Sequence, residues 1–112
     1  MKNFPEISWK IPWYLLDSQV EILALQQRLE TEIQKGHPLF EKDSQVIGRR
    51  IDYDDVLVKL SDGKYAKVHL VWGGIPVADS GKFPSTVIFE SLNDLISSMN
   101  EDAYAYGEDE TQ

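Results

Sequence analysis

The sequence contains no cysteine among its 112 residues. Without thiols the chain forms neither disulfides nor thiolate zinc sites, which excludes the disulfide-stapled class of extracellular proteins. It also lacks a run of about 20 apolar residues, the length that a membrane span needs. The N-terminal segment MKNFPEISWKIPWYLL is interrupted by charge and proline where a signal peptide has an unbroken apolar stretch. We therefore expect a cytoplasmic protein without a membrane partner.

Basic residues are few relative to acidic ones. Eleven Lys and Arg stand against nineteen Asp and Glu, which gives a formal net charge of −8 and an isoelectric point near 4.6. This charge repels phosphate backbones, so we expect no nucleic-acid partner. Negative charge keeps a protein soluble, and it also attracts a basic protein partner and speeds the encounter with it.

Signatures of catalysis and of cofactor binding are equally scarce. The two histidines, His37 and His69, have no neighbour in sequence that would complete a metal-ligand or acid–base pair. His37 follows Gly36 and is expected at a helix end, where a cation offsets the helix dipole. No glycine lies in a phosphate-binding loop, and no serine lies in a nucleophile elbow. We predict no enzymatic activity, no catalytic residue, no cofactor and no metal.

The residues that are present suit one domain with a modest core, since 42% are hydrophobic and twelve are aromatic. Asp62-Gly63 lies between two β-rich runs and predicts an antiparallel hairpin, because glycine tolerates the positive φ of a tight turn. The pattern of apolar and β-branched residues predicts strands at 45–51, 56–60, 65–72 and 86–89.

Two segments show helix signals. Ser18 to Glu21 matches a capping box, and an apolar stripe then recurs at helical spacing to about Lys35. A second helix opens at Ser91. We predict an α+β fold, with an antiparallel sheet of three to four strands, one face of it fully buried, flanked by an N-terminal and a C-terminal helix. Residues 1–100 form this single domain, with 1–16 as an extended arm, and 101–112 form a solvated acidic C-terminal tail.

Three segments carry a resemblance to known proteins: GHPL at 36–39, DDVLVKLSDGKYAKVHLVW at 54–72 and FPSTVIFESLNDLI at 83–96. With them, the C-terminal two-thirds of the chain resembles a group of small, largely uncharacterised bacterial α+β proteins. The overall profile, which is small, acidic and cysteine-free without an active-site signature, is similar to that of bacterial toxin-immunity proteins, including those of contact-dependent growth inhibition and other toxin–antitoxin pairs. That resemblance implies a non-enzymatic protein that binds and neutralises a cognate, basic toxin domain through an acidic surface.

Two acidic segments are the candidates for binding this partner. In the first, three aspartates share a turn that lacks the spacing of a calcium loop, and Arg49 and Arg50 are placed to neutralise them. The second is the acidic tail, whose tyrosines are candidate anchors. The predicted partner-binding residues are Asp52, Tyr53, Asp54, Asp55, Glu101, Asp102, Tyr104 and Tyr106.

Two other classes of function stay open. A small-molecule binding or metabolic accessory domain would use the glycine- and proline-rich loop at 73–85 as a lid over the sheet. An enzyme would need His69 in a cleft with a carboxylate within hydrogen-bonding distance.

Overall fold

The computed structural model describes residues 7, 9–71 and 84–110, with side chains up to Gly107. Its elements are β1 (Trp13–Leu15), α1 (Gln19–Glu32), β2 (Ser44–Arg50), β3 (Asp55–Leu60), β4 (Tyr65–His69), β5 (Ser85–Phe89) and α2 (Leu92–Glu110). Each strand pairs antiparallel with its neighbour in the order β1-β2-β3-β4-β5. The α+β class and the antiparallel sheet are confirmed, but the sheet has five strands rather than the predicted three to four.

The additional strand is β1, which lies in the segment predicted to be an extended arm. It pairs with the end of β2, with Trp13 opposite Arg50 and Leu15 opposite Gly48. Gly48 leaves room for the arm, because a β-carbon built there would lie 2.5 Å from Cζ3 of Trp9. The indole of Trp9 therefore packs closely on Gly48, next to the site where β1 pairs with β2.

Helix α1 forms as its sequence predicts. The Ser18 side chain accepts a hydrogen bond from the N–H of Glu21 at 3.4 Å, which confirms the N-cap. Leu25 and Leu29 are buried and face the sheet, as the apolar stripe predicts. The helix ends at Glu32, slightly before the expected end.

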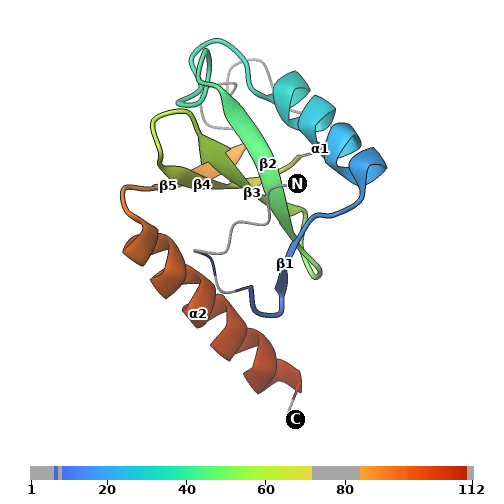
Figure 1. The fold of residues 1–112 in the computed structure, drawn as a ribbon, viewed down its shortest axis with the longest axis vertical. Coiled ribbons are helices and arrows are strands. Elements are labelled where there is room, and N and C mark those ends of the chain that lie inside the picture. Colours follow the sequence, from blue (N-terminus) through green and yellow to red (C-terminus); the bar gives the residue numbers. More distant parts are fainter. Residues whose placement is uncertain (1–6, 8, 72–83, 111–112) are drawn as a thin grey trace.

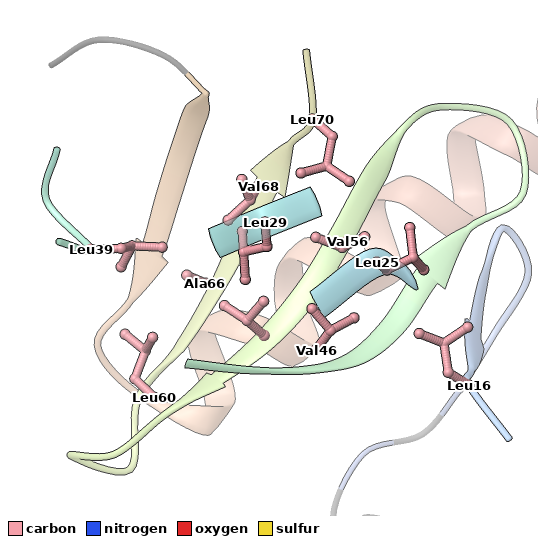
Figure 2. Close-up of a cluster of buried hydrophobic side chains, with 11 residues drawn as sticks. Leu16, Leu25, Leu29, Leu39, Val46, Val56, Leu60, Ala66, Val68 and Leu70 are labelled. Carbon is pink, nitrogen blue, oxygen red and sulfur yellow. The ribbon is translucent and has the colours of Figure 1, made fainter. Parts of the chain in front are cut away.

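The two helices lie on opposite faces of the sheet (Figure 1). The leucines of α1 pack on alternate residues of β3 and β4, including Val56 and Val68, and on Leu70, which follows β4 (Figure 2). On the other face, Leu95 and Met99 of α2 belong to a second buried cluster. This cluster contains Ile7, Trp13, Ile47, Leu57, Tyr65 and Phe89. Helix α2 covers the Tyr65 end of this second face, but His69 and Val87 on the same face remain exposed. The face is only partly covered, which agrees with the expectation that one face alone is fully buried.

The hairpin of β3 and β4 turns at Asp62-Gly63 as predicted, with Gly63 at a φ of 89°. Strand β4 ends at His69, so the predicted strand 65–72 is shorter in the structure. Trp72 and the predicted binding loop at 73–85, up to residue 83, lie outside the described residues.

Helix α2 is longer than the sequence indicates. Its start is as expected, because the Ser91 hydroxyl accepts a hydrogen bond from the N–H of Asp94 at 3.1 Å. It then continues to Glu110, through most of the segment that the sequence set apart as a solvated tail. The acidic segment is therefore a helical extension of the domain.

Candidate protein-interaction site

A hollow of about 430 Å³ opens at the end of the sheet where β2 turns into β3. It is lined by Tyr14, Arg49, Arg50, Ile51, Asp52, Tyr53, Asp54 and His69. Three of the predicted partner-binding residues, Asp52, Tyr53 and Asp54, are therefore found in one concave site.

Asp55 and His69 form a side-chain pair across β3 and β4, where they lie directly opposite each other. Nδ1 of His69 lies 2.5 Å from Oδ1 of Asp55, and the carboxylate is nearly buried whereas the imidazole is about half exposed. A carboxylate at Nδ1 holds the proton there in the neutral imidazole. In that tautomer Nε2 of His69 is a hydrogen-bond acceptor, and the oriented ring lines the hollow.

Arg50 connects the turn to α2. Its Nε and one terminal nitrogen donate to the two carboxylate oxygens of Asp52 at 2.7 and 3.0 Å, and its other terminal nitrogen lies 3.4 Å from Asp102. Asp102 also accepts a hydrogen bond from the indole of Trp13 at 2.9 Å. Burial opposes the charge of Arg50, but the bond to Asp52 and the charges of Asp102, Asp52 and Asp55 outweigh it, so the pKa of Arg50 is raised.

The predicted residues of α2 divide into two groups. Tyr106 is one helical turn from Asp102, so it lies on the same side of α2, and it is half-buried. Tyr104 is two residues from Asp102, so it points away from the Arg50 contact, and its side chain is 72% exposed. Glu101 is exposed as well. The structure thus brings Asp102 to the turn through Arg50 and leaves Tyr104 apart.

We use the name Arg50 surface for the hollow-lining residues Asp52, Tyr53, Asp54 and His69 together with Asp102. The ring of Tyr53 lies over the guanidinium of Arg50, with 4.7 Å between the ring centroid and Cζ, and it remains 58% exposed. An exposed aromatic ring held by a fixed neighbour is typical of an anchor in a protein interface.

Arg49 does not pair with the aspartates of the turn, which corrects part of the expectation. Its Nη1 donates a hydrogen bond to Oε2 of Glu21 in α1 at 3.0 Å. The hydroxyl of Tyr14 donates to the same carboxylate oxygen at 3.3 Å. Burial and the charge of Glu21 raise the pKa of Tyr14 above its ordinary 10.0, although Arg49 opposes them. Both guanidinium groups of the hollow are therefore matched by carboxylates of the chain itself.

His37 does not cap α1 as expected but is buried, with 5% of its surface exposed. Its Nδ1 accepts a hydrogen bond from the N–H of Leu39 at 3.0 Å, and its Nε2 donates to the carbonyl of Pro84 at 2.9 Å. These bonds connect the segment after α1 to the start of β5. The role of His37 in the structure is thus to join two parts of the fold.

No family model, curated protein or solved structure matches the chain. Within residues 7, 9–71 and 84–110, no three His, Asp or Glu side chains are grouped so as to hold a metal ion. In that same part of the chain, no helix has both the length and the apolar character needed to cross a membrane. What the molecule binds therefore has to follow from the chemistry of its own surface.

Proposed function

We propose that the protein is a non-enzymatic immunity protein that binds a cognate bacterial toxin domain through the Arg50 surface and neutralises it. The observation that supports this most directly is the double contact of Arg50 with Asp52 and Asp102. It joins the two acidic segments into one continuous surface, although they are far apart in the sequence. An interface needs such a contiguous patch, and two separate charged segments would not supply it.

Charge and preorganisation both favour a basic protein partner. A toxin that acts on nucleic acids needs a basic surface, and a chain with a net charge of −8 attracts such a surface. The carboxylates of Asp52 and Asp102 are already oriented by Arg50, so binding does not have to order them. Tyr53 adds an exposed ring at the centre of the patch.

The test is co-expression with the product of the adjacent upstream gene, followed by co-purification and by a growth assay of cells that express that product. We expect a complex and protected growth with the natural chain, and loss of both with the double variant Tyr53→Ala, Asp54→Lys. Asp43→Lys is the matched control, because Asp43 is exposed just before β2, at the opposite end of this strand from the hollow. The absence of a complex with the natural chain, or equal protection by all three proteins, would overturn the proposal.

One observation favours a second candidate, an enzyme with His69 as general base. The Asp55–His69 pair at the hollow has the geometry that orients such a base. The nearby groups suited to bind an anionic substrate, Arg49 and Arg50, are however occupied by carboxylates of the chain. If His69→Ala abolished protection of the cells while the toxin complex still formed at full affinity, catalysis would replace simple binding as the explanation.

A further inference from the structure

We infer that the hollow receives a cationic side chain of the partner, an arginine or a lysine, with Asp54 and Nε2 of His69 as its hydrogen-bond acceptors. This inference rests on the proposed function, because it names the chemical group of the partner that enters the Arg50 surface. It goes beyond that function in assigning a specific pocket and a specific pair of acceptors.

His69 provides the first part of the argument. Because the carboxylate of Asp55 accepts the hydrogen bond from Nδ1–H of the neutral ring, Nε2 is left to accept a hydrogen bond from a ligand and cannot donate one. Lysine and arginine side chains carry donors only. A fixed acceptor beside a nearly buried carboxylate therefore matches a cationic donor better than an anion.

The balance of charges provides the second part. Arg49 is paired with Glu21, and Arg50 with Asp52 and Asp102, so neither guanidinium is left as a site for an anion. In and directly behind the lining, five carboxylates stand against two guanidinium groups. These carboxylates are Glu21, Asp52, Asp54, Asp55 and Asp102.

Asp54 is the carboxylate that remains for a partner. Within the described part of the chain its side chain makes no hydrogen bond or ion pair, and it is exposed at the rim of the hollow. Its backbone carbonyl accepts a hydrogen bond from the N–H of Leu70 at 2.9 Å, which holds the turn against the end of β4. The carboxylate of Asp54 is thus held on a fixed backbone and pairs with none of the described residues.

Tyr53 completes the pocket. Its ring lies over Arg50 and more than half of its surface is exposed, so ring surface is left for a second cation. The volume of about 430 Å³ accommodates one long side chain together with water. The hollow thus offers a carboxylate, an imidazole acceptor and an aromatic ring, and each of these groups can bind a guanidinium or an ammonium.

The test uses small probes in place of the toxin, so that its failure differs from failure of the proposed function. The purified chain is titrated with Nα-acetyl-L-arginine amide at about pH 8, where an ordinary imidazole is neutral, while the ring signals of His69 are followed by NMR. Nα-acetyl-L-citrulline amide has nearly the same shape without the charge, and inorganic phosphate serves as the anionic probe.

We expect saturable shifts of the His69 signals with the arginine probe, about tenfold weaker binding of the citrulline probe, and no saturable response to phosphate. Asp54→Asn should weaken arginine binding about fivefold, whereas Asp43→Asn should not change it. Tighter binding of phosphate than of arginine, or equal binding of arginine and citrulline, would overturn the inference. It would also fail if Asp54→Asn, shown to be folded by its unchanged Tm, bound arginine like the natural chain.

Discussion

At the scale of single residues, Asp55 illustrates how a charge is accommodated inside this fold. Only 8% of its surface is exposed, and its partner is the imidazole of His69 on the neighbouring strand. A buried carboxylate needs hydrogen bonds to replace those it made with water. The pairing therefore serves stability as well as the orientation of His69.

Replacing Asp55 with alanine removes this bond and leaves Nδ1 of His69 without its acceptor. We expect the free energy of unfolding to fall by about 1–3 kcal/mol, measured by urea denaturation. Asp54→Ala is the control one residue away, and because Asp54 is exposed it should change stability by less than about 0.5 kcal/mol. An equal fall in the free energy of unfolding of the two variants would contradict a specific role of the Asp55–His69 pair in stability.

The raised pKa of Tyr14 leads to a prediction for alkaline pH. Burial and Glu21 disfavour the phenolate, so the folded chain holds the proton more tightly than the unfolded chain does. The resulting stability is fully present below the ordinary pKa of 10.0 and is lost as the pH rises through the higher pKa of the folded state. Tyr14→Phe should abolish this part of the loss, which thermal unfolding between about pH 9 and 11 measures. An unchanged pH profile in Tyr14→Phe would contradict the assignment.

At the scale of elements, α1 protects an exposed edge of β2. Strand β1 pairs only with Gly48–Arg50, so the preceding residues of β2 have no strand on that side. There the side-chain amide of Gln26 donates to the carbonyl of Ser44 and accepts from the N–H of Val46, both at 2.8 Å. The amide thus replaces a missing backbone strand, and it satisfies groups that would otherwise invite pairing with another chain.

Gln26→Ala should therefore expose this edge. We expect a loss of about 1–3 kcal/mol in the free energy of unfolding and faster amide hydrogen exchange at Val46. Gln27→Ala is the matched control, because its side chain is exposed on the same helix and the substitution is identical. If both variants lost the same stability, helix propensity rather than the edge contact would be the cause.

The helices and strands also show which features can be predicted from local sequence patterns. The capping serines and the apolar stripe of α1 were predictable, because they depend on neighbours within one helical turn. Strand β1 was not, because it has three residues and depends on pairing with a distant strand. The full length of α2 was not predictable either, because its second half depends on a distant contact. Asp102 in that half accepts a hydrogen bond from Trp13, 89 residues away.

The hairpin register explains why the Asp55–His69 pair was not predicted. A two-residue turn centred on Asp62-Gly63 would place Asp55 opposite Leu70, on the other face of β4 from His69. In the structure Lys59 lies opposite Tyr65, so the register is shifted by one residue and Asp55 faces His69. Gly63 at positive φ accommodates the additional residue of the turn. The turn was predictable from Asp-Gly, but the side chains that it brings together were not.

At the scale of the whole molecule, the contacts of Asp102 join the first and last elements of the fold. Its two oxygens receive the indole of Trp13 from β1 and the guanidinium of Arg50 from β2. Lys10 adds a hydrogen bond to Asn100 at 3.0 Å nearby. The second half of α2 is thereby held against the sheet by polar contacts.

Asp102→Ala should release this half of the helix. We expect a loss of about 2–3 kcal/mol in stability, since the hydrogen bonds involve a charged group, with faster hydrogen exchange confined to the end of α2. Glu101→Ala should leave both quantities unchanged, because its side chain is exposed. Uniform exchange along α2 in the natural chain and in Asp102→Ala would contradict this role.

The bond between Trp13 and Asp102 also has a consequence for biosynthesis. The two residues are 89 positions apart, so a ribosome that adds about 5–20 residues per second needs roughly 4–18 s to supply Asp102 after Trp13. Arg50 is added partway through that interval, and from then on it is present without its contact on α2. The Arg50 surface is therefore completed only after Asp102 has been synthesised, and a nascent chain does not present it to a partner before then.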